Sequence, residues 1–363
     1  ERKKFSNIYL FLKSLYNFIN MKNNKWTLYL GIFLPLAFYS CSSDTTEIPG
    51  DEQGLVEIRM STGIASDASP VTRGDGMINS TLTADLNVSF ARADKTESSG
   101  AAYAATYAAS KLDGTVAQSG GTLTFSPKQY YLANGANTKL IGWYPQSGTY
   151  TQVGRTVGFN VDGSTDIMVT KLKEGNKASQ ITAVQLEHLL TQISVKAYAV
   201  DADAKTVWGG IKSIKIKGMK QTCTVTLPDP SSANVDAEAT VAFTGTDDLP
   251  LVQKDPTDNS DIQQSGSNYG DTNPLELAVG NTTPVLAGYA MFAPVAAVGD
   301  AKITLEIAME KGGAAETKEI ILAAGYQKSN SYAITLKFTS AEIAPSVTVA
   351  AWTPATPPGE VEI

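Results

Sequence analysis

Apolar and polar residues alternate along many short stretches of this chain. In LVEIRMST (residues 55–62), Val56, Ile58 and Met60 alternate with polar residues, which is the period of two expected of a half-buried strand. The other stretches that predict strands are LNVSFARA, TLTFSPKQYYL, TKLIGWYP, TDIMVT, QISVKAYAV, GIKSIKIKG, TCTVTL, PVLAGYAMFAPV, KITLEIAME, KEIILAA, YAITLKF and SVTVAAW. Because Gly, Asn, Asp and Pro separate them, the pattern predicts an all-β fold built from β-sandwiches.

Three stretches break this pattern. ESSGAAYAATYAASKLDG (97–114) fits a helix or a loop of small residues equally well, whereas QKDPTDNSDIQQSGSNYGDTNP (253–274) is a long polar loop. KLKEGNKAS (171–179) is a charged run that fits a domain boundary. We therefore expect an N-terminal sandwich over residues 55–175 and a C-terminal one over residues 180–363.

The first forty residues have a different pattern. Met21 opens MKNNKWTLYLGIFLPLAFYSC, in which two lysines precede an apolar run. That run is too short for a membrane span, which needs about 20 apolar residues. We expect residues 21–40 to be a cleaved export signal, and residues 1–20 to be an upstream extension of the reading frame.

Cys41 stands at the exit of this signal, where an ordinary buried cysteine fits poorly. The segment resembles a bacterial lipobox, whose cysteine receives a diacylglycerol, although Phe38 and Tyr39 replace the usual leucine and small residue. Two or three acyl chains, at about 0.8 kcal/mol per buried methylene, would hold the protein durably on a membrane. Residues 41–54 would then be a flexible acidic tether.

Composition limits the possible functions. The 363 residues carry a net charge of −7, and loss of the basic leader would make the rest more acidic. Nucleic-acid binding is not expected, because contacts to phosphates need clustered Lys and Arg. Cys223 is the only cysteine besides Cys41, so an acylated Cys41 leaves no internal disulfide.

Catalytic side chains are scarce. His188 is the only histidine, which excludes a multi-histidine metal centre and leaves one candidate base. Its setting, LEHLL, favours a hydrogen-bonded histidine at the edge of a core. The carboxylates are scattered, and we expect neither a cofactor nor a metal. Aromatic residues that could stack on sugars fit core packing better; they are Trp143, Tyr144, Trp208 and Trp352.

Several blocks together resemble one known family. They are TLTFSPKQYYLANGANTKLIGWYP (122–145), TDIMVT (165–170), VQLEHLLTQISVKA (184–197) and GYQKSNSYAITLKFTSAEIAPSVTVAAW (325–352). In this order, and behind a lipoprotein leader, they resemble the fimbrillins, the major and minor subunits of type V pili. The resemblance covers most of the chain after the leader.

The resemblance implies two transthyretin-like, Greek-key β-sandwich domains and passage through the lipoprotein export machinery to the outer membrane. There, an Arg- or Lys-specific protease cuts a loop after the first strand. Loss of that strand opens an apolar groove, which a C-terminal strand of the next pilin subunit fills. The contact is heterologous and does not close on itself, so it produces a fimbria at the cell surface that supports adhesion.

Residues 55–62 are the candidate removable strand. The following loop, GIASDASPVTRGDG, is rich in small and polar residues and should be easily cut. Arg73 lies in this loop, and Gly74 leaves the scissile bond sterically open. Arg59 is less suitable because it lies inside the predicted strand, and Arg92 lies beyond it.

The donor strand is expected from about residue 345 onward. SVTVAAW (346–352) has Val347, Val349 and Ala351 on one face, and the last five residues add Val361 and Ile363. Prolines between these two parts cannot donate backbone hydrogen bonds and act as a spacer. SVTVAAW fits the last strand of the second domain equally well.

Other functions stay open on the residues alone. A surface lipoprotein that binds glycans through aromatic side chains would keep its lipid, and Arg73 would not be cut. A secreted hydrolase is a poor fit, because the chain has a single histidine. Arg73-Gly74-Asp75 matches an integrin-binding tripeptide, but so short a match occurs by chance in many proteins.

Overall fold

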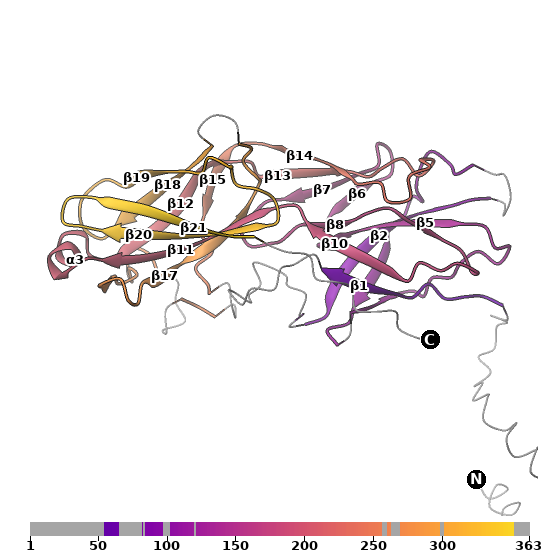
Figure 1. Cartoon of the computed structure of the whole chain (residues 1–363), viewed down its shortest axis with the longest axis horizontal. Helices are drawn as coiled ribbons and strands as arrows, with labels where there is room; N and C mark the ends of the chain where they lie inside the picture. Colours follow the sequence, from indigo (N-terminus) through magenta and orange to yellow (C-terminus); the bar gives the residue numbers. More distant parts are fainter. Residues whose placement is uncertain are drawn as a thin grey trace, which may run out of the picture. The chain divides into compact units, whose positions relative to one another are not determined.

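The computed structural model describes residues 54–64, 82, 84–96, 102–119, 121–255, 260–262, 269–297 and 301–351. These residues form sheets joined by turns, so the all-β prediction is confirmed (Figure 1). The helix α3 (Ala202–Trp208) is the only helix within these ranges. The strands are β1 (Met60–Ile64), β2 (Leu86–Asp94), β3 (Leu112–Val116), β4 (Thr122–Phe125), β5 (Thr138–Tyr144), β6 (Thr149–Thr151), β7 (Thr156–Asn160), β8 (Met168–Thr170), β9 (Lys173–Gly175), β10 (Ala183–His188), β11 (Thr191–Ala199), β12 (Ile211–Met219), β13 (Thr222–Thr226), β14 (Thr240–Thr244), β15 (Asp247–Pro250), β16 (Ala278–Val279), β17 (Val285–Phe292), β18 (Lys302–Met309), β19 (Glu316–Ile321), β20 (Asn330–Phe338) and β21 (Ile343–Ala351).

The N-terminal strands form a sheet that closes on itself. Its order is β2-β3-β4-β1-β10-β8-β5-β9, and β2 also pairs with β5. Strand β1 lies inside this row, antiparallel to β4 and parallel to β10. Closure leaves no free edge between β2 and β5. The side chains enclosed by these strands form the first core, which contains Ile58, Met60, Ile64, Leu86, Val88, Phe90, Val116, Leu123, Phe125, Tyr131, Leu140, Met168, Ile181, Val184 and Leu186.

The C-terminal strands form two facing sheets. One has the order β16-β11-β20-β21, with β17 also paired to β11, and the other has the order β15-β12-β18-β19. Their apolar faces form the second core, which includes Ile193, Ile214, Leu305 and Phe338. Alternating burial along β18 follows the sequence pattern, since only one face of the strand contacts this core.

A further sheet combines strands from both halves of the chain. Its order is β14-β13-β7-β6, so residues 222–226 pair with residues 156–160. It packs in the third core, which contains Val157 and Val225 together with Ile141 and Trp143 of β5. Because Leu140 of β5 faces the first core, β5 is buried on both sides. This double burial explains why its sequence is nearly continuously apolar.

The predicted division between residues 175 and 180 remains a prediction. Strand β10 follows that point in sequence and pairs with β1 and β8 in the N-terminal sheet. Strand β13 likewise pairs with β7.

One local prediction was wrong in its bounds, and of the two alternatives for residues 97–114 the helix was wrong for the part that the structure describes. The first strand begins at Met60 and not at Leu55, because residues before it pair with a loop: Glu57 bridges Tyr130, and the Ile58 amide donates to the Gln129 carbonyl at 2.7 Å. The strand ends at Ile64 and not at Thr62. The described part of 97–114 outside β3 is not helical.

The short helix α3 was missed, although its start carries a sequence signal. Asp201 is its N-cap, and the carboxylate accepts a hydrogen bond from the Ala204 amide. Within the seven residues of α3, Ala204 and Trp208 face the second core. So short a helix depends on such packing, which local propensity does not reveal.

Candidate assembly site

Strand β1 is held by hydrogen bonds on both sides. The Ser61 amide donates to the Thr182 carbonyl at 2.9 Å, and the Thr62 amide donates to the Gly121 carbonyl at 2.7 Å. Its register pairs Met60 with Leu123 of β4. On the opposite side, residues 61–64 pair with residues 183–186 of β10. The strand therefore fills a position between two others, and its departure would leave β4 and β10 each unpaired on the side that faced β1.

The buried face of β1 supplies a row of side chains to the first core. Met60 and Ile64 of β1 are each 3% exposed, and Ile58, two residues before the strand, is 1% exposed and continues the row. Full burial of each such side chain contributes about 1.5–3 kcal/mol. Leu123 and Val184, on the flanking strands, contribute to the same core. Removal of β1 would thus uncover an apolar groove one strand wide.

The predicted residues of the first strand lie together, as the alternation implied. Val56 packs at the edge of the first core, outside β1 itself. Thr62 and Ile64 continue the same row and were missed as members of it. Ile64 keeps the period of two in the sequence, whereas the polar Thr62 interrupts the apolar alternation and hides the continuation of the row.

Of the arginines considered for cleavage, the structure describes two. The Arg59 side chain is 56% exposed, lies one residue before β1 and donates to Glu57. The Arg92 guanidinium is 12% exposed and donates to Asp94 and to the Tyr130 carbonyl, which protects it from a protease. Arg73 and Gly74 lie outside the described residues, as does the lipidation candidate Cys41.

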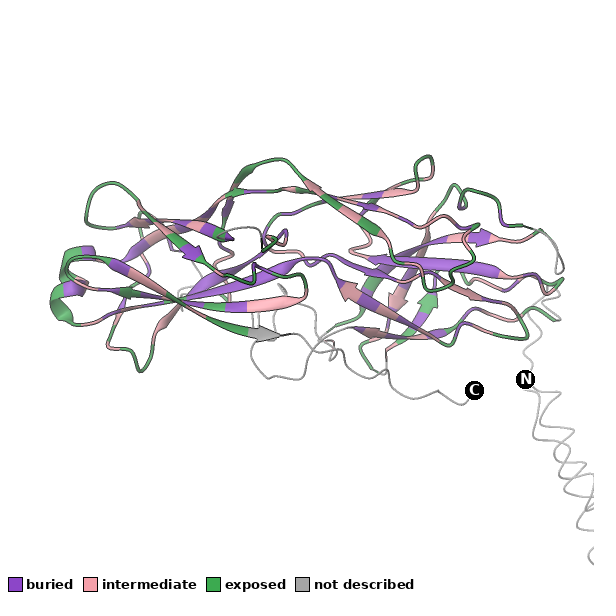
Figure 2. Ribbon diagram, turned by 45° about the horizontal axis from the view of Figure 1, so that its top comes forward, coloured by how far each residue is buried: buried purple, intermediate pink, exposed green. Residues whose placement is uncertain are grey.

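The candidate donor residues Val347, Val349 and Ala351 lie on β21, which runs antiparallel to β20. Among the described strands β21 pairs with β20 alone, so it is the edge of its sheet. Ile343, at its start, is 2% exposed, whereas Val349 is 53% exposed. Figure 2 colours the ribbon by burial, with buried residues in purple and exposed residues in green. The strand is thus anchored at its beginning and lightly packed toward its end. The other two candidates, Val361 and Ile363, lie outside the described residues.

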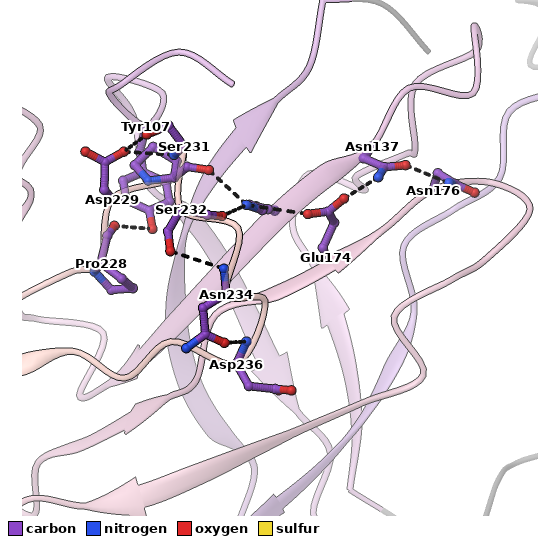
Figure 3. A network of polar contacts seen from close by, with 12 residues as sticks. Tyr107, Asn137, Glu174, Asn176, Pro228, Asp229, Ser231, Ser232, Asn234 and Asp236 are labelled. Atoms are coloured by element: carbon purple, nitrogen blue, oxygen red, sulfur yellow. Dashed lines mark hydrogen bonds and ion pairs between the residues drawn. The ribbon is translucent and has the colours of Figure 1, made fainter. Parts of the chain in front are cut away.

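A network of polar contacts fixes the connection between β13 and β14 to the N-terminal sheet (Figure 3). Lys139 of β5 is 2% exposed, and its Nζ donates to the carbonyls of Pro230 at 3.0 Å and Ser232 at 2.6 Å. The same Nζ lies 3.4 Å from Glu174 Oε2 and 4.3 Å from the centre of the Tyr103 ring. A buried lysine needs such partners, because an uncompensated charge is very costly to desolvate.

The network continues on both sides of Lys139. Asn137 donates to Glu174 and accepts a hydrogen bond from Asn176 at 2.7 Å. Burial raises the pKa of the Tyr103 phenol, with a smaller contribution from Glu174, so this ring stays neutral at physiological pH. The contacts are mutual and enclosed, which indicates a structural role.

His188 is enclosed and not poised for catalysis. It is 0% exposed, and its Nδ1 lies 2.5 Å from Asp166 Oδ2, on a side chain that is equally buried. A substrate cannot reach an imidazole in this position. Its place at the end of β10 agrees with a hydrogen-bonded histidine within the core.

The aromatic side chains proposed for glycan stacking do not form a platform. Trp143 is 0% exposed and stacks on Tyr150. Trp208 is 8% exposed, donates from Nε1 to the Thr339 carbonyl at 2.6 Å and packs edge-to-face on Phe338. Tyr144 packs at the first core, and Trp352 lies outside the described residues.

The described part of the chain lacks both a metal-binding cluster and a membrane-spanning helix. It contains no cluster of three or more His, Cys, Asp or Glu side chains arranged to hold a metal ion. It also contains no helix long and apolar enough to cross a bilayer.

The family model described as fimbrillin-like matches residues 77–352, which is more than half of the chain. The chain belongs to the fimbrillin-like family. Membership agrees with the resemblance inferred from the sequence, and it supports a role as a structural pilus subunit and not as an enzyme. It also places the chain in a cell-surface appendage and indicates assembly with other pilin subunits.

Solved structures similar to this fimbrillin-like chain come from Bacteroides and Parabacteroides species. A candidate cell adhesion protein of Bacteroides uniformis ATCC 8492 is 16% identical with a TM-score of 0.50, covering 83% of this chain and all (100%) of its own. Its counterpart from Bacteroides ovatus ATCC 8483 is 14% identical with a TM-score of 0.47, covering 83% and 98%. A fimbrial protein of Bacteroides vulgatus ATCC 8482 is 11% identical with a TM-score of 0.38, covering 82% and 100%. The first similarity shows a shared fold, and no curated protein matches the chain.

Proposed function

We propose that this fimbrillin-like protein polymerises by strand exchange after a protease removes β1. The observation that carries the proposal is the place of β1 inside a closed row of strands, where it can be separated from the rest by one cut in the chain that follows it. An edge strand would leave only one unpaired neighbour when lost. An internal strand leaves a slot with hydrogen-bonding groups on both walls, which a new strand can occupy.

The proposed cut follows Arg73, and several features support this position. Arg73 lies between β1 and β2, so cleavage there would separate β1 from the other strands. The match to the fimbrillin-like family begins at residue 77 and therefore excludes β1. Of the alternatives, Arg92 is held inside β2 by its hydrogen bonds, and a cut at Arg59 would leave β1 attached to the subunit.

The proposed donor is the C-terminal segment that begins at residue 345. Strand β21 is an edge strand in its own subunit, and its end packs lightly. Its exchange into the slot of a second copy would bury Val347 and Val349. The second copy would offer its own β21 to a third, so the contact is head-to-tail and open-ended.

The proposed route to the surface begins at the outer membrane. The leader before Cys41 would direct export, and a lipid on Cys41 would hold the precursor at the membrane. Cleavage after Arg73 would release the subunit from that lipid. The fimbria would then grow from released subunits and support adhesion.

The deciding experiment treats the purified precursor with an Arg-specific protease. We expect a product that begins at Gly74 and a ladder of SDS-resistant polymers. The matched variants are Arg73→Ala and Arg59→Ala: the first should remain monomeric, and the second should polymerise like the wild type. Recovery of lipid-modified Cys41 in sheared fibres would contradict the processing model. An uncut monomer retained on a polysaccharide gel would favour a glycan-binding lipoprotein.

A further inference from the structure

Strand β1 carries one polar side chain in its buried row. Ile58, Met60 and Ile64 are apolar, but Thr62, between the last two, is a threonine that is only 7% exposed. Among the described residues its Oγ1 has no hydrogen-bond partner. A buried hydroxyl that gives up water without a replacement hydrogen bond destabilises the element that carries it.

The surroundings of Thr62 explain why its hydroxyl finds no partner. On β10 it lies opposite Val184, which is apolar and buried. On the other side its amide donates to the carbonyl of Gly121, a residue with no side chain to offer. A Cβ on Gly121 would lie 2.8 Å from the Thr62 carbonyl oxygen, so this close approach also bars a larger, polar neighbour.

We propose that Thr62 is a built-in weakness of β1, which makes the strand easier to displace than an all-apolar strand of the same length. Once β1 has left, the position in the first core that the Thr62 side chain had occupied would favour an aliphatic side chain. This inference rests on the proposed strand exchange, and it names the feature of the incoming strand that the slot selects.

The proposed donor strand has the required feature. Along β21, Pro345, Val347 and Val349 form one row, while Ser346 and Thr348 fall on the other. The β21 of a second copy of this chain can thus place a valine where β1 has Thr62. The hydroxyls of Ser346 and Thr348 would then be directed to the opposite face. Replacement of β1 by the donor strand restores the backbone hydrogen bonds and removes the desolvated hydroxyl of Thr62. The state with the donor strand bound is therefore more stable than the state with β1 in place.

The first test compares the uncut precursor with its Thr62→Val variant. Valine keeps the shape of threonine and removes the hydroxyl, so the variant should melt about 2–4 °C higher. Thr124→Val is the matched control, because Thr124 is exposed on the adjacent strand β4 and should leave the melting temperature unchanged. A Thr62→Val precursor no more stable than the wild type would overturn the inference.

The second test follows the cut proteins. After treatment with an Arg-specific protease, release of the β1 peptide is measured by mass spectrometry and polymer growth by light scattering. We expect both to be about 5- to 30-fold slower in Thr62→Val, and unchanged in Thr124→Val. Equal rates in wild type and Thr62→Val would overturn the inference while leaving strand exchange intact. Retention of the peptide in every protein, without polymers, would overturn the proposed function and this inference with it.

Discussion

Lys139 is the buried charge on which the attachment of the β13–β14 connection depends. Replacing it with methionine keeps the length of the side chain, removes the ammonium group beside Glu174 and leaves two carbonyls without their donor. We expect Lys139→Met to lower the free energy of unfolding by about 3–5 kcal/mol, measured by denaturant titration. The control, Lys128→Met, alters a side chain that is 60% exposed and should stay within about 0.5 kcal/mol of wild type. Equal denaturation midpoints for Lys139→Met and the wild type would show that the buried network contributes nothing to the free energy of unfolding.

The Cys223 thiol should be unreactive toward alkylating reagents in the folded protein. It is 0% exposed in the third core, and burial raises the pKa of its thiol to about 12. Only the thiolate reacts, and at pH 8 it would be about one part in ten thousand. We expect no alkylation of Cys223 by iodoacetamide in the native state and complete alkylation in denaturant, detected on its peptide by mass spectrometry. Rapid native labelling would mean that the third core opens readily.

Individual residues differed in how far the sequence revealed their place. The alternation of Val56, Ile58 and Met60 correctly predicted a row facing a core. A single lysine inside the apolar run of β5 could have signalled Lys139 as a buried cation, but the two carbonyls that accept its hydrogen bonds lie in a loop more than ninety positions away. No local pattern encodes such a contact, because tertiary packing decides it.

Strand β21 should be the loosest of the paired strands in its sheet. It is bonded on one side only, and its exposure rises from Ile343 to Val349. We expect its amides to exchange with deuterium faster than those of β20, which is bonded on both sides. In the same strand, Ile343→Ala should destabilise the protein by about 2–5 kcal/mol and Val349→Ala by less than about 0.5 kcal/mol. Equal protection of β20 and β21 would argue against a releasable donor.

The elements themselves were predictable in type and less so in extent. Alternation identified β18 and β20, where one face of the strand is buried and the other is partly exposed to solvent. It placed the start of β1 five residues early, because the residues before Met60 are extended and bridge a loop without being part of the strand. The parallel pairing of β1 with β10 joins segments about 120 positions apart, which no short-range pattern can specify.

The described chain as a whole is tied together by pairings that cross its midpoint. Strand β10 completes the N-terminal sheet, and β13 and β14 extend the strands β6 and β7. Sequence similarity to the fimbrillins indicated the fold class, whereas the division between two sandwiches at residues 175–180 rested on a polar run. That run carries β9, and Leu172 within it is buried, so the boundary remains a prediction.

Head-to-tail growth predicts how two variants, each lacking one half of the strand exchange, assemble when mixed. Arg73→Ala would keep β1 and could only donate a strand, while a chain ending at Ala344 would lack most of β21 and could only accept one. After protease treatment each alone should remain monomeric, and an equimolar mixture should stop at the dimer, seen by size-exclusion chromatography with light scattering. Circular dichroism of the truncated chain controls for folding. Long polymers from the mixture, or from the truncated chain alone, would show that residues after Ala344 are not the donor.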